Sequence, residues 1–266
     1  MSLLASQRQD RILERVSQFG AARVSELVEL LDVSDMTIRR DVEALAARGL
    51  VERVHGGVMA VGGKSTDEPG FQAKSSLQTR EKRAIARAAA ELVEPGSAVA
   101  VSAGTSTYAV ARELRSIEGL TVVTNSIPVA QLLHENPRED LTVILTGGIR
   151  TPSDALVGPV AVAALRALHV DCLFLGVHGV DMRAGLTTPN MVEAETNRAL
   201  VDSARRLVVT ADHTKWGVVG LSTIARLDEV DVLVTDSGLG SAARDIIGDT
   251  VQRLVVVNRE PVEAAG

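Results

Sequence analysis

The spacing of apolar residues changes once along this chain, and that change constrains the fold more than any other feature. Up to about residue 47, apolar residues recur at intervals of three and four, as in Ile38, Val42 and Leu45. This is the spacing of one helix face. From about residue 97, short apolar runs bounded by glycine, threonine and asparagine alternate with helical stretches. Such alternation is typical of parallel strands joined by crossover helices.

The two patterns predict two domains. Residues 1–60 are expected to form the first domain, 61–79 a linker rich in glycine, serine and proline, and 80–266 the second domain, an open, mostly parallel α/β fold. Three short helices and no strand are expected over residues 5–47. Helices are expected over 80–93 and 191–204, and strands over 97–101, 121–124, 142–146, 171–176, 207–210, 231–235 and 253–257.

The composition limits the function classes. The net charge of −6 argues against a protein that coats nucleic acid through an overall positive field. Residues 1–60 carry 8 basic and 9 acidic side chains, so any DNA contact must depend on a few placed arginines. Aromatic residues, at 2%, are too few for single-strand stacking platforms. No apolar run approaches the roughly 18 residues of a membrane span, so no membrane partner and a cytoplasmic location are expected.

Cofactor and metal signals are weak. The one cysteine, Cys172, lies in an apolar run and is expected to be buried rather than nucleophilic. His178 and His213 have no third ligand at a convincing spacing, so no metal site is predicted. The chain lacks the glycine-rich patterns of ATP and dinucleotide sites, so no cofactor is expected.

The third expected helix has a side suited to DNA. Ser34 is expected to cap it, as Ser25 is expected to cap the second helix. Because the apolar face packs inward, Thr37 and Arg40 lie largely on the opposite side and Arg39 to one side. Side chains near the start of such a helix contact base edges and phosphates in the major groove.

A wing is predicted directly after this helix. Gly49 is expected to end the helix, and residues 50–58 alternate like a strand before turning at Gly56 and Gly57. Arg53 or His55 would contact the DNA backbone or the minor groove. The alternative is a three-helix protein-interaction domain with a solvated arginine pair.

Residues 33–42 are Val-Ser-Asp-Met-Thr-Ile-Arg-Arg-Asp-Val, and residues 53–57 are Arg-Val-His-Gly-Gly. This pattern closely resembles the DeoR family of bacterial repressors. The resemblance implies a winged helix-turn-helix whose Ser34, Thr37, Arg39 and Arg40 contact a double-stranded DNA operator. Because operator half-sites mirror a two-fold protein, a homodimer or homotetramer is expected.

A candidate anion site lies in the second domain. Residues 102–107, Ser-Ala-Gly-Thr-Ser-Thr, separate an expected strand from a helix expected to begin near Tyr108. Small residues let a phosphate approach the backbone, hydroxyls donate to it, and a helix N-terminus adds unpaired amides. The alternative is a simple helix cap. The predicted cradle consists of Ser102, Gly104, Thr105, Ser106 and Thr107.

Similar loops follow later strands. Because the carboxyl ends of parallel strands converge on one crevice, a single pocket is predicted. Its further residues are Asn125, Gly147, Gly148, Asp181, Glu193, Asp212 and Lys215.

The order of these loop motifs is also similar to the DeoR sensor domain, which itself resembles sugar-phosphate isomerases. The resemblance implies a Rossmann-like, sugar-phosphate-isomerase-like fold, a phosphorylated sugar or polyol effector, and a repressor of carbohydrate or polyol catabolism. An isomerase or deaminase with a helical appendage is the rival, because Asp181, Glu193, Asp212 and Lys215 also suit proton abstraction. Asn197 stands where many family members have lysine, which disfavours catalysis.

Overall fold

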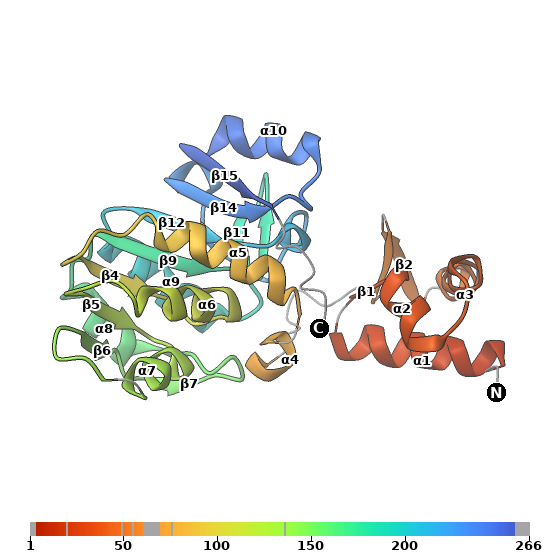
Figure 1. Ribbon diagram of the computed structural model, residues 1–266, viewed down its shortest axis with the longest axis horizontal. Coiled ribbons are helices and arrows are strands. Elements are labelled where there is room, and N and C mark those ends of the chain that lie inside the picture. Colours follow the sequence, from red (N-terminus) through yellow and green to blue (C-terminus); the bar gives the residue numbers. More distant parts are fainter. Residues whose placement is uncertain are drawn as a thin grey trace, which may run out of the picture. The chain divides into compact units, whose positions relative to one another are not determined.

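The computed structural model describes residues 4–19, 21–48, 50–54, 56–60, 70–75, 77–135 and 137–258. The chain divides into two compact units, Met1–Pro69 and Gly70–Gly266 (Figure 1). Of the expected linker, residues 61–69 lie outside the described residues, and the part from Gly70 onward belongs to the second unit.

The first unit contains three helices and a small antiparallel sheet. Its elements are α1 (Ala5–Phe19), β1 (Ala21–Arg23), α2 (Val24–Leu31), α3 (Asp35–Ala47), β2 (Val51–Val54) and β3 (Gly57–Ala60). Ile12, Leu27, Ile38 and Leu45 are fully buried in its core. The three helices and the β2–β3 hairpin are confirmed. The absence of a strand before residue 47 was wrong, because β1 pairs with β3 of the hairpin and has no alternating pattern of its own.

The helix ends of this unit follow from local hydrogen bonds. Ser34 caps α3 as expected, since its hydroxyl accepts the backbone N–H of Thr37 at 3.3 Å. Ser25 does not cap α2. That helix begins at Val24, two residues earlier than a Ser25 cap would give, because strand pairing ends at Arg23, which occupies the N-cap position. Gly49 lies outside the described residues, and Arg48 is the C-cap of α3.

The second unit is built on a seven-stranded sheet. Its strands are β4 (Ala98–Val101), β5 (Thr121–Thr124), β6 (Thr142–Leu145), β9 (Cys172–Gly176), β12 (Leu207–Thr210), β14 (Val232–Asp236) and β15 (Arg253–Val257). They are all parallel and follow the order β6-β5-β4-β9-β12-β14-β15. The seven strands expected from the sequence and the open, parallel α/β fold are therefore confirmed.

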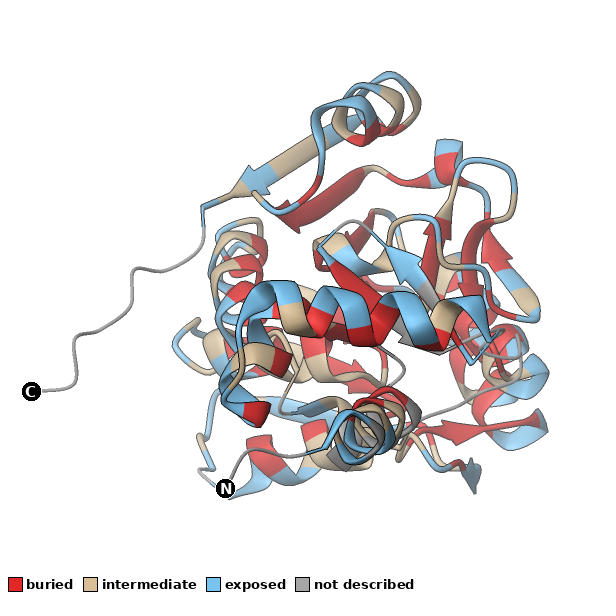
Figure 2. Ribbon diagram, turned by 90° about the vertical axis from the view of Figure 1, so that its right-hand side faces the viewer, coloured by how far each residue is buried: buried red, intermediate tan, exposed pale blue. Residues whose placement is uncertain are grey.

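Helices cover both faces of this sheet. One face packs against α5 (Thr79–Ala90), α6 (Thr105–Leu114) and α7 (Ile127–His134), and the other against α8 (Pro159–Arg166), α9 (Met191–Ser203) and α10 (Ser241–Thr250). Along β4, Val99 and Val101 enter the core under α5 and α6, while Ala100 enters the core on the α8 and α9 side. Burial on both faces explains why the five inner strands are continuous apolar runs, whereas the edge strands β6 and β15 are partly exposed (Figure 2).

The strand order reverses between β4 and β9. From β4 the chain proceeds outward through β5 to β6, then returns to place β9 on the other side of β4 and continues outward to β15. In folds of this kind ligands bind at the carboxyl ends of the strands where the order reverses, here β4 and β9. We refer to this end of the sheet as the crevice.

Smaller elements were not expected from the sequence. They are α4 (Phe71–Ser75), the hairpin of β7 (Ile149–Arg150) and β8 (Leu156–Val157), the antiparallel sheet of β10 (Gly179–Asp181), β11 (Gly185–Thr188) and β13 (Ser222–Ala225), and the 3-10 turns η1 (His213–Lys215) and η2 (Leu227–Glu229). Two further expectations change. Asp181 ends a hairpin strand instead of lying in a loop of the main sheet, and α6 begins at Thr105, three residues before Tyr108.

Candidate functional sites

Helix α3 presents a polar, arginine-bearing side. The hydroxyls of Ser34 and Thr37 are 2.9 Å apart at its start. Arg39 and Arg40 are exposed, and Arg39 forms an ion pair with Asp35 one turn earlier. Within the described residues, Arg40 forms no ion pair. The side expected to face DNA therefore carries one paired arginine and one unpaired arginine.

Asp41, the next residue, has a structural role that the sequence analysis missed. It is buried, and its carboxylate accepts hydrogen bonds from Arg8 Nε at 2.7 Å and from Gln9 Nε2 at 3.3 Å. Both partners belong to α1. This contact joins α1 to α3 and so orients the helix that carries Arg39 and Arg40.

The hairpin contributes Arg53 to the same unit. Its guanidinium lies 3.0 Å from Glu43 Oε1 of α3, and both side chains are more than half exposed. His55, predicted as a second wing contact, lies outside the described residues.

The loop between β4 and α6 contains the predicted anion cradle, and it brings the N-terminus of α6 to the end of β4. Gly104 is the N-cap of α6 and has φ +149°, and a Cβ there would lie 3.2 Å from Thr107 Oγ1. The Thr107 hydroxyl donates to the Gly104 carbonyl at 3.0 Å. Because the first N–H groups of a helix have no partner within it, Thr105 and Ser106 present backbone donors here.

Ser102 and Asn125 form hydrogen bonds that hold this loop. Ser102 Oγ accepts the N–H of Gly176, at the end of β9, at 3.0 Å. Asn125 Oδ1 accepts the N–H of Ala103 at 2.9 Å, and its Nδ2 donates to the carbonyl of Leu156 at 3.2 Å. Ser102 and Asn125 are almost completely buried. They fasten the ends of β4, β5, β8 and β9 together, so their side chains hold the crevice in shape.

Gly147 and Gly148 border the crevice after β6. Gly147 has φ +73° and Gly148 has φ +123°. A Cβ on Gly148 would lie 2.5 Å from the carbonyl oxygen of Val157. This close backbone approach accounts for glycine at position 148.

Asp181 ends β10 of the small antiparallel sheet. Its Oδ1 accepts the backbone N–H groups of Arg183 and Ala184 at 2.8 and 2.9 Å. These two bonds lower the pKa of the Asp181 carboxyl. The carboxylate thus closes the β10–β11 turn.

Glu193 lies in the first turn of α9. Its carboxylate accepts hydrogen bonds from the hydroxyls of Thr151 at 2.7 Å and Thr188 at 3.4 Å. It therefore joins the loop before β8 to the start of α9. Asn197, four residues later on the same helix, is buried.

Asp212 and Lys215 lie in the turn after β12. Asp212 caps η1 by accepting the N–H of Thr214 at 3.0 Å. A further charged residue, Lys82 of α5, interacts electrostatically with both Asp212 and Lys215. Lys82 is 6% exposed, and burial, aided by Lys215 and Lys74, lowers its pKa to about 8. Lys82 was not predicted as a site residue, although it lies three positions before Ile85 on the buried side of α5.

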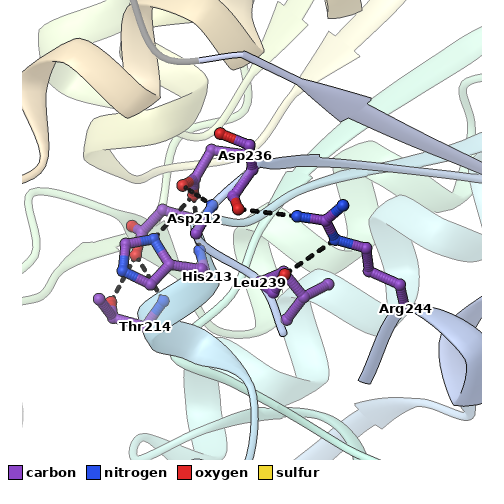
Figure 3. Close-up of polar contacts among 8 residues, drawn as sticks. Asp212, His213, Thr214, Asp236, Leu239 and Arg244 are labelled. Carbon is purple, nitrogen blue, oxygen red and sulfur yellow. Dashed lines mark hydrogen bonds and ion pairs between the residues drawn. The ribbon is translucent and has the colours of Figure 1, made fainter. Parts of the chain in front are cut away.

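A second network fixes the same turn. His213 Nδ1 lies 2.9 Å from Asp236 Oδ1 at the end of β14, and Arg244 Nε donates to the carbonyl of Leu239 at 2.8 Å (Figure 3). Arg244 also donates to the carbonyl of Ser237 at 2.7 Å. The turn that carries Asp212 and Lys215 is thereby tied to the neighbouring strand.

Cys172 is buried, as expected, and burial raises the pKa of its thiol to about 11. In the part of the chain that the structure describes, no three metal-binding side chains gather. None of the described helices is both long and apolar enough to cross a membrane.

A winged helix-turn-helix followed by a doubly wound α/β unit defines a two-domain, DNA-binding transcriptional regulator. The model of the DeoR-like helix-turn-helix domain matches residues 8–62, and that of the DeoR C terminal sensor domain matches residues 77–237. The chain belongs to the DeoR family.

Relatives agree with this assignment over most of their length. The chain is 37% identical to YgbI, an uncharacterized HTH-type transcriptional regulator of Escherichia coli K12, over 96% of this chain and 100% of the relative. It is 35% identical to a putative aga operon transcriptional repressor of Escherichia coli O157:H7, over 88% and 87%. It is 34% identical to the glycerol-3-phosphate regulon repressor of Escherichia coli K12, over 87% and 91%.

Among solved structures, ribose 5-phosphate isomerase A from Methanocaldococcus jannaschii aligns with 51% of this chain and 53% of its own. The sequence identity is 17% and the TM-score 0.38.

Proposed function

We propose that this protein is a cytoplasmic repressor of a carbohydrate or polyol catabolism operon, and that a phosphorylated sugar or polyol in the crevice weakens its binding to operator DNA. The observation that carries the proposal is the α6 N-terminus, placed beside the β4–β9 strand reversal with Lys82, Asp212 and Lys215 in the same unit. Two of the relatives, the putative repressor of the aga operon and the repressor of the glycerol-3-phosphate regulon, support this effector class by their names.

Operator binding is assigned to α3 and the hairpin. Ser34 and Thr37 provide phosphate contacts, Arg39 and Arg40 contact bases or phosphates, and Arg53 and His55 contact the flanking backbone or minor groove. Arg39 and Arg53 are paired with Asp35 and Glu43, so DNA must displace two carboxylates. Arg40 has no such competitor within the described residues, and we assign it the largest share of specific affinity.

The effector phosphate is assigned to the α6 loop. The backbone of Gly104 and Thr105, with the hydroxyl of Ser106, forms the cradle. Thr107, which is buried and donates to the Gly104 carbonyl, holds the loop in place together with Ser102 and Asn125. Gly147 and Gly148 line the next strand end. Glu193, Asp212 and Lys215 bind the hydroxyl groups of the carbohydrate, and Asp181 is left out because its carboxylate closes a hairpin turn.

A two-fold assembly is part of the proposal, since a repressor of this class contacts two operator half-sites. An apolar surface on the second unit suits such an assembly. Ile149 is 68% exposed and Val192 is 43% exposed. Both side chains lie next to Gly158, since a Cβ built on this glycine would be 3.9 Å from a side-chain carbon of each. Light scattering on the wild type and on Ile149→Asp tests the assignment, and an unchanged oligomer in the variant contradicts it.

The rival function is a sugar-phosphate isomerase or deaminase. Proton abstraction beside a carbonyl needs a carboxylate base that faces the substrate. Glu193 is bonded to two threonine hydroxyls, and Asn197 replaces the lysine of many family members. This arrangement favours binding over turnover.

One pair of measurements tests the proposed function. The purified chain is incubated with DNA from its own promoter in a gel shift, with and without a panel of phosphorylated sugars and polyols, and the same panel is assayed for turnover. We expect retention of the DNA, its release by one phosphorylated compound, and no turnover. Turnover without DNA retention would overturn the proposal.

A further inference from the structure

Helix α4 is held at the crevice end of the second unit by three contacts. Lys82 Nζ donates to the carbonyl oxygen of Lys74 at 2.7 Å. The ring of Phe71 packs edge-on against Tyr108 of α6, with centroids 5.6 Å apart. The N–H of Phe71 donates to the carbonyl of Pro152 at 3.4 Å. Each anchor belongs to a segment that borders the crevice: the start of α5, the first turns of α6, and the loop before β8.

Charges of both signs act on Lys82. Lys82 interacts with Lys74 and Lys215, which repel it, and with Asp212 and Glu81, which attract it. Lys82 is 6% exposed. Because burying an ammonium is costly unless it is well paired, a buried lysine that two other lysines repel suits an anion.

Thr210 adds a second polar group on the same side of the sheet. It ends β12, two residues after Val208, which packs in the core beneath α5. Its hydroxyl oxygen is buried and has no hydrogen-bond partner among the described residues. A buried hydroxyl without a partner is uncommon, because it loses its bonds to water without replacement. A water molecule or a bound ligand supplies the partner of such a hydroxyl.

We propose that Lys82 is an effector-binding residue and that it links the crevice to α4. The phosphate of the effector takes the Lys82 ammonium away from the Lys74 carbonyl, Thr210 donates to the same ligand, and α4 is released. Because the chain enters the second unit directly at α4, its release alters the attachment of the DNA-binding unit. This inference rests on the proposed function and adds the residue through which the effector acts.

The first test needs no ligand. Hydrogen exchange of the α4 amides is measured on the full chain in the wild type, in Lys82→Met and in Arg83→Met. Arg83 is the exposed neighbour on α5, so its variant removes one positive charge and keeps the hydrogen bond between Lys82 and Lys74. We expect exchange roughly tenfold faster in Lys82→Met, as for loss of a charge-assisted hydrogen bond, and wild-type exchange in Arg83→Met. Equal protection in all three would overturn the link to α4.

The second test uses glycerol 3-phosphate and ribose 5-phosphate as probes, with glycerol and ribose as controls. For a phosphate ester that binds the wild type, we expect roughly tenfold weaker binding to Lys82→Met, unchanged binding to Arg83→Met, and faster α4 exchange in the wild type. Equal binding to Lys82→Met would overturn Lys82 as a ligand and leave the effector assignment intact. If neither ester binds to the wild type, neither compound is the effector. The assignment of Lys82 as a ligand of these esters is then wrong as well.

A third variant keeps Lys82 and weakens only the docking of α4. Phe71→Ala removes the ring contact with Tyr108. We expect faster α4 exchange and unchanged or tighter binding of the ester, because less docking free energy competes with the ligand. Weaker binding to this variant would contradict competition between α4 and the effector, even if Lys82→Met does not fold.

Discussion

His213 and Asp236 join two neighbouring strand ends of the sheet. The imidazole Nδ1 of His213 lies 2.9 Å from Asp236 Oδ1, and the same oxygen accepts the backbone N–H of His213 at 2.8 Å. Gly238 donates its N–H to the other oxygen at 2.8 Å. Burial raises the pKa of Asp236, but these hydrogen bonds outweigh it and bring the pKa to about 2.

The first prediction concerns acid stability. Because the pKa of Asp236 falls from 3.8 to about 2 on folding, its stabilising contribution is complete above about pH 4 and is lost as the pH falls through 2. Between about pH 4 and pH 2 the wild type loses unfolding free energy. In Asp236→Asn we expect this loss to be smaller than in the wild type by roughly 2 kcal/mol. Urea unfolding at a series of pH values measures it, with the exposed Asp245→Asn as control. Parallel profiles for Asp236→Asn and the wild type would contradict the assignment.

The second prediction concerns the buried lysine. The pKa of Lys82 falls from 10.5 to about 8, so its charge destabilises the fold fully below pH 8, less between pH 8 and 10.5, and not at all above. We expect Lys82→Met to raise the unfolding free energy at pH 7 by about 2 kcal/mol, after allowing for the lost hydrogen bond. The gain should vanish near pH 10.5. If Lys82→Met were less stable than the wild type at pH 7, the prediction would be wrong. The ammonium of Lys82 would then be compensated by its partners.

The third prediction concerns operator binding. Arg40→Ala should weaken binding by roughly 1 to 3 kcal/mol if the guanidinium contacts a base. Fluorescence anisotropy with promoter DNA and unrelated DNA at two salt concentrations separates the roles. A base contact lowers affinity for the promoter only, whereas a phosphate contact lowers both and reduces the salt slope. Arg226→Ala, on the second unit, removes the same charge and should bind normally. Unchanged promoter affinity in Arg40→Ala would remove it from the contact surface.

The fourth prediction concerns Gly148. A Cβ at this position meets the Val157 carbonyl at 2.5 Å, and φ is +123°. We expect Gly148→Ala to lower the unfolding free energy by roughly 2 kcal/mol, because both the contact and the backbone conformation oppose a side chain. Gly240→Ala is the matched control, since nothing lies within 4 Å of its Cβ and its φ is −65°. Equal melting temperatures for the two variants would mean that the β7–β8 hairpin shifts at little cost.

Much of the fold could be predicted from the sequence because its signals are local. The apolar stripe of α3 and the Ser34 cap depend on residues three or four positions apart. The parallel strands are short apolar runs, which can be recognised without knowing their neighbours. The β1 strand could not be predicted, because three residues, Ala21–Arg23, become a strand only by pairing with β3. Asp181 was misplaced for the same reason, since its hairpin forms on a second, antiparallel sheet.

By itself the sequence determined the two-unit organisation, the helix-turn-helix, and the loop at the start of α6. Tertiary structure alone decided what individual side chains do there. Ser102 and Asn125 fasten strand ends, and Asp41 holds α3 against α1. Lys82 enters the charged group of Asp212 and Lys215 from a helix 130 positions earlier in the numbering than Asp212. Local spacing records which elements form, whereas the partners of a buried polar group are chosen by packing between distant segments.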